Sequence, residues 1–170
     1  NTLCVSSQAG CAMGCKFCAS TLNGRVRNLT PSEILGQVAA ATRDTGERIS
    51  GIVMMGIGEP LDNYDNVIKS IKILHEPDGL NIGYRNFTLS TSGLVDGIYN
   101  LTQEGLPLNL SISLHAPNDA LRRELLPIAK RYTIEEILDA AKNYFDDSGR
   151  RVTIEYLLIS EVNDTTELAK

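Results

Sequence analysis

Three cysteines lie within eight consecutive residues near the amino end of the sequence. Cys11, Cys15 and Cys18 follow the spacing Cys-x3-Cys-x2-Cys. A structural zinc site normally takes four protein ligands, often as two Cys-x2-Cys pairs. A cubane iron–sulfur cluster held by three thiolates instead leaves one iron open to an outside ligand, as chemistry at the cluster requires. The spacing predicts a [4Fe–4S] cluster with an open iron; the alternatives are a zinc site completed by His115 and a loop with incidental thiols.

Two further segments offer groups that could bind a ligand at the ends of strands. The run Gly56–Pro60 contains Gly58 and Glu59 and directly follows an apolar stretch. Glycine allows a backbone to approach a ligand closely, and a carboxylate suits an ammonium group. Ser90 closes another apolar stretch. Each segment also has a plain structural interpretation, as a Gly/Pro turn and as a serine that caps a turn.

One stretch, 108–114, is apolar on one face and polar on the other. The residues on its polar face are Asn109, Ser111, Ser113 and His115. A parallel strand covered by helices on both faces should be apolar on both, so a polar face indicates a ligand-filled interior. Ser113 and His115, at its end, are therefore candidate ligand contacts. His75 lacks such a context and is interpreted as structural.

Strands and amphipathic helices alternate along the whole chain and must position these groups. Val/Ile/Leu-rich stretches predict strands at 2–6, 52–55, 87–90, 108–114 and 152–159. Apolar periodicity and stop signals predict helices at 31–45, 63–76, 95–104 and 134–148. Thr30–Glu33 and Thr133–Glu136 are capping boxes, which fix where the first and last of these helices begin.

Strands that alternate with helices predict an α/β fold with a parallel sheet and right-handed crossovers. A complete eight-unit barrel takes about 250 residues. With 170 residues and five units, we expect one domain over 1–170, a partial (β/α)6-type TIM barrel truncated at both ends. The sequence begins with Asn1 rather than Met, and 163–170 reads as the start of a helix. A doubly wound open sheet is the alternative fold.

Composition narrows the class of protein. The chain is 42% hydrophobic and 22% charged, with a net charge of −5. No apolar run reaches the ~20 residues of a membrane span, and we expect a protein without a secretory leader. Clustered thiols in such a chain favour metal binding in a reducing compartment, so we expect a cytoplasmic protein. The acidic balance does not by itself indicate a nucleic-acid partner, although Lys16, Arg25 and Arg27 form a local basic spot.

The cysteine loop directly after a first strand resembles the signature of the radical S-adenosylmethionine superfamily. The chain as a whole is similar to the core of the RNA adenine-C2 methyltransferases. The stretches that carry this resemblance are Cys4–Cys11, Arg27–Leu29, Met54–Pro60, Leu89–Gly93, Ile112–Asp119 and Val162–Asp164. The triplet alone indicates the superfamily, and these stretches in family order indicate the family.

The resemblance implies a role for each candidate residue. Cys11, Cys15 and Cys18 would hold the [4Fe–4S] cluster. The contacts to S-adenosylmethionine would come from Gly58, Glu59, Ser90, Ser113, Leu114 and His115. Cys4, otherwise interpreted as a small buried apolar residue, would be catalytic and help to resolve a covalent RNA–protein adduct.

The resemblance also implies a reaction and its partners. The family uses a 5′-deoxyadenosyl radical and a methyl group carried on a further cysteine to methylate adenine C2 in 23S rRNA and, in many bacteria, in tRNA. An electron donor such as flavodoxin reduces the cluster. The methyl-carrying cysteine has no candidate here, so an N-terminal accessory domain and a C-terminal segment are expected to be missing and the chain alone to be inactive in methylation.

Three alternative functions stay open at the level of sequence. The related C8-methylating rRNA resistance enzymes share most of these stretches. A glycyl-radical activase would share the cysteine triplet but not the Cys4 segment or the run from Ser111 to Asp119. A non-catalytic, zinc-stabilised RNA-binding module would contain zinc and neither iron nor sulfide.

Overall fold

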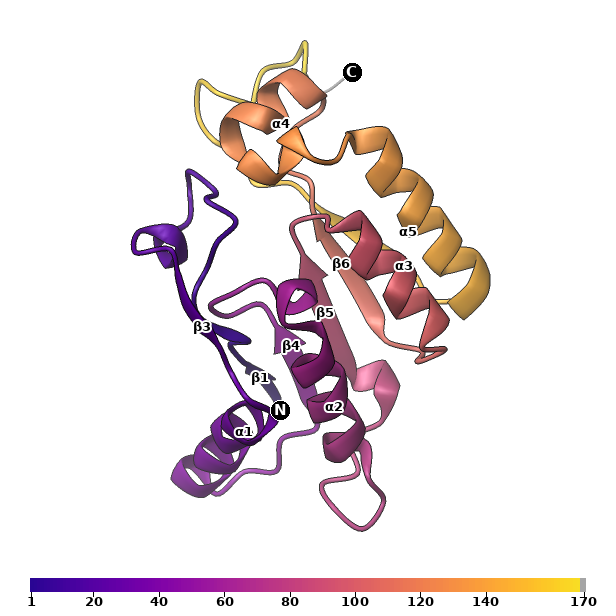
Figure 1. Ribbon diagram of the computed structural model, residues 1–170. Coiled ribbons are helices and arrows are strands. Elements are labelled where there is room, and N and C mark those ends of the chain that lie inside the picture. Colours follow the sequence, from indigo (N-terminus) through magenta and orange to yellow (C-terminus); the bar gives the residue numbers. More distant parts are fainter. Residues whose placement is uncertain (169–170) are drawn as a thin grey trace.

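The computed structural model describes residues 1–168 and contains one five-stranded parallel sheet (Figure 1). Its strands are β1 (Thr2–Cys4), β4 (Gly51–Met54), β5 (Phe87–Thr91), β6 (Asn109–Ser113) and β7 (Val152–Glu155). They are hydrogen-bonded in the order β1-β4-β5-β6-β7, and every pair is parallel. A doubly wound sheet reverses its strand order at a switch point, whereas a barrel adds each strand beside the last. The order without reversal confirms the partial-barrel prediction.

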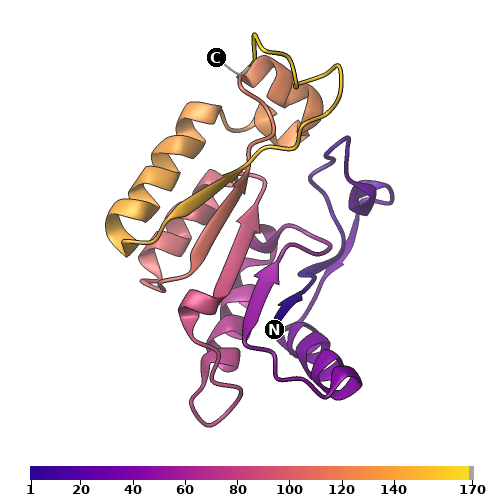
Figure 2. The ribbon, with the colours of Figure 1, turned by 180° about the vertical axis from the view of Figure 1, so that it is seen from behind.

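Helices connect the strands. They are α1 (Pro31–Thr45), α2 (Tyr64–His75), α3 (Val95–Gln103), α4 (Asp119–Leu125) and α5 (Ile134–Ser148). Short 3-10 helices occupy Ala19–Thr21, Pro60–Asn63, Tyr84–Asn86 and Pro127–Lys130. The two opposite views show α2, α3 and α5 on one face of the sheet, with α4 beyond its carboxyl edge (Figures 1 and 2). Within the described residues no helix is long and apolar enough to cross a membrane.

Local sequence explains where the two longest helices begin and end. At α1 the Thr30 side chain accepts a hydrogen bond from Glu33 N, and the Glu33 carboxylate accepts one from Thr30 N. Thr133 and Glu136 form the same reciprocal pair at α5. Both helices end at a glycine with a left-handed backbone. Both predicted capping boxes are therefore confirmed.

The core lies between the sheet and its helices. Ile52, Leu89, Leu110 and Ile112 project from three strands into it and are each fully buried. The alternate residues of β6 face the other way, and this face of the sheet is not covered by α2, α3 or α5 (Figure 2). The predicted division of β6 into an apolar and a polar face is thus confirmed.

Several elements differ from the sequence prediction. The first strand ends at Cys4 and the last at Glu155, both earlier than expected. An antiparallel hairpin, β2 (Gln8–Gly10) with β3 (Arg25–Asn28), flanks the cysteine loop and was not predicted. Its strands have only three and four residues and no apolar alternation. Within 163–170, residues up to 168 form turns rather than a helix, and the last two lie outside the described residues.

Helix α4 was also missed. Its seven residues are too few to show helical periodicity clearly. The side chain of Asn118 accepts a hydrogen bond from Leu121 N at 3.0 Å, which starts the helix directly after Pro117.

Candidate functional site

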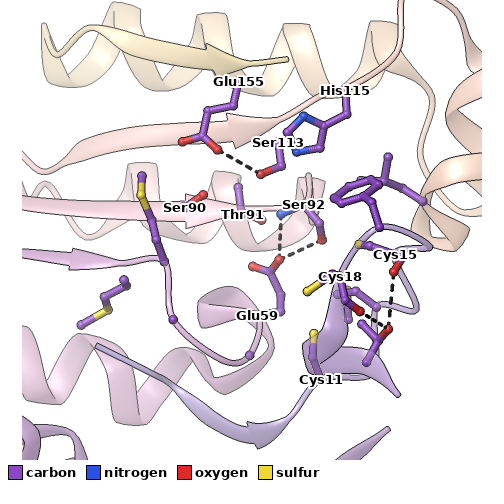
Figure 3. A pocket seen from close by; sticks show the side chains of 18 residues that line it. Cys11, Cys15, Cys18, Glu59, Ser90, Thr91, Ser92, Ser113, His115 and Glu155 are labelled. Atoms are coloured by element: carbon purple, nitrogen blue, oxygen red, sulfur yellow. Dashed lines mark hydrogen bonds between the residues drawn. The ribbon is translucent and has the colours of Figure 1, made fainter. Parts of the chain in front are cut away.

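A pocket opens at the carboxyl ends of the strands, where barrel active sites gather (Figure 3). It brings together most of the predicted site residues. Those that line it are Cys11, Cys15, Cys18, Gly58, Glu59, Ser90, Ser113 and His115. Leu114 and Cys4 do not line it. Segments from the ends of three strands and the cysteine loop therefore meet at one place, as the sequence predicted.

The cysteine loop is held by contacts within the loop and with residues at the end of α4 and just after it. The Thr21 hydroxyl donates to Cys18 O at 3.0 Å, and Lys16 N donates to Leu125 O at 2.9 Å. Gly14 has φ +72°, and an added Cβ would lie 3.2 Å from Pro127 Cγ. The contacts of Lys16 and Gly14 fix the loop against Leu125 and Pro127, at and just after the end of α4.

Two of the three thiols, Cys11 and Cys15, lie in an environment that disfavours negative charge. All three are free, and Cys11 is buried. Burial, together with repulsion from the nearby Cys11, Cys18 and Glu59, raises the pKa of Cys15 to about 11. Burial likewise raises the pKa of Cys11. Thiolates there need a positively charged partner, and three soft sulfur donors around one pocket fit an iron–sulfur cluster.

The same donors do not converge on a single point. Among the described residues, no group of three or more His, Cys, Asp or Glu side chains is placed to hold one metal ion. A structural zinc site requires four donors, with sulfurs about 2.3 Å from the metal. Among the described residues, these side chains therefore form no preassembled site for a single ion.

Glu59 is a buried carboxylate held entirely by the protein. One oxygen accepts hydrogen bonds from Ser92 N at 2.7 Å and Ser92 Oγ at 2.8 Å, and the other accepts from Leu61 N at 3.1 Å. Burial raises its pKa, and these hydrogen bonds oppose that shift. The Glu59 carboxylate thus ties the end of β4 to the end of β5 at the wall of the pocket.

Gly58 is required by the close approach of the hairpin. Its φ is +112°, and an added Cβ would lie 2.7 Å from both Ser7 Oγ and Gln8 Cβ. The main reason for glycine is therefore packing of the chain against itself.

We expect Gly58→Ala to lower the free energy of unfolding by about 1–3 kcal/mol, because it adds backbone strain and a clash. Chemical denaturation measures this loss. Gly36→Ala is the control: Gly36 lies inside α1 with open space around it, so alanine should be neutral or stabilising by up to about 1 kcal/mol. Equal stability of Gly58→Ala and the parent chain would contradict this account of the turn.

His115 has a strained backbone at the end of β6. Its φ is +57°, rare for a residue other than glycine. Leu157 N donates to its Nδ1 at 3.0 Å, and the buried Asn163 donates from Nδ2 to its carbonyl at 2.8 Å. Burial lowers its pKa, and Phe17 meets its ring edge-on with centroids 5.0 Å apart. Strain held in place by such partners is typical of functional sites.

Other candidates lie elsewhere or are already paired. Cys4 is exposed on β1, so it is not the small buried residue of the structural interpretation. His75 bonds through Nδ1 to Ile82 O, which agrees with a structural role. The predicted basic spot is weaker than expected, because Arg25 pairs with Asp62 and Arg27 with Glu33.

The sequence analysis missed Glu155, which lines the pocket from the end of β7. Ser111 Oγ donates to its Oε1 at 2.6 Å and Ser113 Oγ to its Oε2 at 3.3 Å. A signal was present: in 152–159, Thr153 and Glu155 alternate with apolar residues, so the carboxylate falls on the polar face.

The sequence analysis also missed Arg122 and Ser92, whose hydrogen bonds hold the wall of the pocket. Arg122 is fully buried in α4 and donates from Nη2 to Ser92 O at 2.6 Å and from Nε to Leu114 O at 3.2 Å. Leu114 therefore contributes through its backbone. No sequence pattern singled out Arg122. It is the first of three consecutive charged residues, and such a run is typical of a solvent-exposed helix face.

Comparison with curated proteins finds relatives that share one name, that of an RNA methyltransferase. It is 58% identical to the probable dual-specificity RNA methyltransferase RlmN of Clostridium acetobutylicum, over the whole chain and 49% of that protein. The protein of the same name from Symbiobacterium thermophilum is 55% identical over the whole chain and 46% of its own length. The chain thus spans about half the length of these curated relatives.

A solved structure and a family model both relate the chain to radical SAM proteins. A crystal structure of a radical SAM methyltransferase from Sphaerobacter thermophilus matches with a TM-score of 0.95 and 49% identity, over 99% of this chain and 50% of that one. The model of the radical SAM superfamily matches residues 5–169. The chain belongs to the radical SAM superfamily.

Proposed function

We propose that this chain is the cofactor-binding core of an RNA methyltransferase that modifies adenine C2 in 23S rRNA and in tRNA. The observation that carries the proposal is the pocket itself, in which three free thiols face polar groups from the ends of successive parallel strands. The names of its relatives support RNA as the substrate class.

In this proposal Cys11, Cys15 and Cys18 hold the [4Fe–4S] cluster. The residues that contact S-adenosylmethionine are Gly58, Glu59, Ser90, Ser113, Leu114 and His115. When bound, the cluster supplies the electron that cleaves S-adenosylmethionine, and the cofactor carries this difficult step.

The protein's contribution is to bind and orient. The Ser92–Glu59 hydrogen bonds fix one wall of the pocket. The accepted hydrogen bond at Nδ1 keeps the proton of a neutral His115 on Nε2. Phe17 and Met13 line the pocket beside the thiols and limit water there. Cys4, exposed on the uncovered sheet face, is free to act on RNA delivered to that face.

The complete protein would supply what the chain lacks. We propose an N-terminal accessory domain and a C-terminal segment with the methyl-carrying cysteine, because the chain spans about half of its relatives. An electron donor such as flavodoxin would reduce the cluster. We place the protein in the cytoplasm, where thiols stay reduced.

The isolated 170-residue chain should cleave S-adenosylmethionine after anaerobic cluster reconstitution and dithionite reduction, yet leave RNA unmethylated. The four cysteines of the sequence are the triplet and Cys4, so no thiol remains to carry the methyl group. Chromatography of 5′-deoxyadenosine and mass spectrometry of digested 23S rRNA fragments test both halves. Methylated adenine in the product RNA would refute the proposal that the methyl-carrying cysteine lies outside this chain. Absence of 5′-deoxyadenosine would refute the assignment of the cofactor site.

A further inference from the structure

Arg122 is a buried positive charge that has no carboxylate partner. Its side chain is fully buried in α4, and of the Asp, Glu, Lys and Arg side chains in residues 1–168 only Glu59 is buried as well. No ion pair of the described residues includes Arg122. Burying a charge without a group of opposite sign is costly, so buried charges in proteins are normally paired. The position of Arg122 therefore indicates a further negative group close to it.

The hydrogen bonds of Arg122 leave part of its guanidinium unused. Nη2 donates to Ser92 O at 2.6 Å, and Nε donates to Leu114 O at 3.2 Å. Nη1 is shielded from solvent in the same way and has no hydrogen-bond partner among the described residues. A buried donor without an acceptor is costly. This nitrogen therefore indicates an acceptor that a bound group supplies.

The cysteine loop lies directly against the helix that carries Arg122. Cys15 packs against the buried Leu125 and Leu126, and the backbone N–H of the residue after Cys15 donates to Leu125 O at 2.9 Å. Burial lowers the pKa of Arg122, and the nearby Asp119 and Cys15 oppose this shift. One thiol of the triplet is thus among the acidic groups close to the buried guanidinium.

The two nearby carboxylates do not pair with this guanidinium. Glu59 is connected to it only through Ser92, whose N–H and Oγ donate to the carboxylate while its carbonyl accepts from Arg122. Asp119 instead accepts a hydrogen bond from Ile134 N at 2.9 Å. The thiolates of the cysteine triplet are therefore the best source of negative charge beside Arg122.

We propose that Arg122 is the fixed positive charge that balances the iron–sulfur cluster held by Cys11, Cys15 and Cys18, and that it raises the reduction potential of this cluster. This inference rests on the proposed function. A [4Fe–4S] core with three thiolate ligands is negatively charged, and one electron taken from a reductant makes it more negative. Net charge and surroundings set the potential of a cluster, and a positive charge acts strongly where the dielectric constant is low. Arg122 would therefore stabilise the reduced state.

The test separates the charge of Arg122 from its packing. The midpoint potential is measured by redox titration with electron paramagnetic resonance, on anaerobically reconstituted chains of matched iron and sulfide content without S-adenosylmethionine. Arg122→Gln removes the charge and should lower the equilibrium constant for reduction about tenfold or more, which is about 59 mV for one electron. Arg122→Lys keeps the charge and should stay within about threefold of the parent chain. Arg123→Gln, at an exposed arginine of the same helix, should do the same.

The outcomes separate this inference from the function on which it rests. A parent chain that binds no cluster would overturn the proposed function. A parent chain with a cluster whose potential Arg122→Gln leaves unchanged would keep that function and overturn the role of Arg122. Equal shifts in Arg122→Gln and Arg122→Lys would also overturn it, because loosened packing rather than charge would then explain them.

A second measurement on the parent chain decides the matter if Arg122→Gln fails to fold. The side-chain N–H resonances of isotope-labelled arginine are followed by nuclear magnetic resonance. The Nε–H resonance of Arg122, identified by its loss in Arg122→Lys, should broaden when the cluster is reduced and paramagnetic. The resonance of Arg43, in α1, should stay sharp. An equally sharp Arg122 resonance in the reduced chain would place the guanidinium away from the cluster and overturn the proposal.

Discussion

Cys15→Ala is expected to reduce the release of 5′-deoxyadenosine from S-adenosylmethionine to the background of a protein-free reaction. Cys15 lines the pocket between the other two thiols in sequence, and its backbone carbonyl accepts a hydrogen bond from Cys18 N. Two thiolates would leave two irons of a cubane without protein ligands, and such a cluster is easily lost. The measurement is chromatographic quantitation of 5′-deoxyadenosine after dithionite reduction, alongside the iron and sulfide content of each sample.

Cys4→Ala is the matched control for this loss. Cys4 is an exposed cysteine of the same chain and does not line the pocket. The Cys4→Ala variant should keep its iron, its sulfide and its rate of cofactor cleavage. Full cleavage by Cys15→Ala, or equal loss in both variants, would contradict the assignment of the triplet as cluster ligands.

The second large effect is expected at Arg122. This side chain is fully buried and donates to the carbonyls of Ser92 and Leu114. Arg122→Met fills much of the same volume but leaves two buried acceptors without donors, at about 1–3 kcal/mol each. We therefore expect the free energy of unfolding to fall by about 2–5 kcal/mol, measured by chemical denaturation.

The neighbouring Arg123 provides the comparison. It is exposed on the same helix, so Arg123→Met should change the free energy of unfolding by no more than about 0.5 kcal/mol. Since Arg122 joins the end of β5 to the end of β6, its loss should also loosen the wall that carries Ser92 and Glu59. A similar stability for both variants would show that the buried guanidinium does not hold these strand ends.

Much of the architecture could be predicted because its signals are local. The capping boxes at Thr30 and Thr133 set helix starts that the structure reproduces. The alternation along β6 predicted a polar face, and Ser113 and His115 do line the pocket. Parallel strands place their carboxyl ends together, so residues far apart in sequence could be assigned to one site before their geometry was known.

What could not be predicted depends on contacts distant in sequence. The β2–β3 hairpin is held by pairing of 8–10 with 25–28 and by the fit of Gly58 against Gln8. Arg122 looks like a surface residue until the carbonyls of Ser92 and Leu114 surround it. The basic spot is weaker than predicted, because Asp62 pairs with Arg25 and Glu33 pairs with Arg27. Propensity and periodicity carry no information on such long-range partners.

The central claim is that Cys11, Cys15 and Cys18 hold a cluster with one iron open to S-adenosylmethionine. It is tested most directly by electron paramagnetic resonance of the anaerobically reconstituted, dithionite-reduced chain before and after addition of S-adenosylmethionine. We predict the signal of a reduced [4Fe–4S] cluster whose shape changes when the cofactor binds. A chain that shows no cluster signal, or a signal that S-adenosylmethionine leaves unchanged, would contradict the claim.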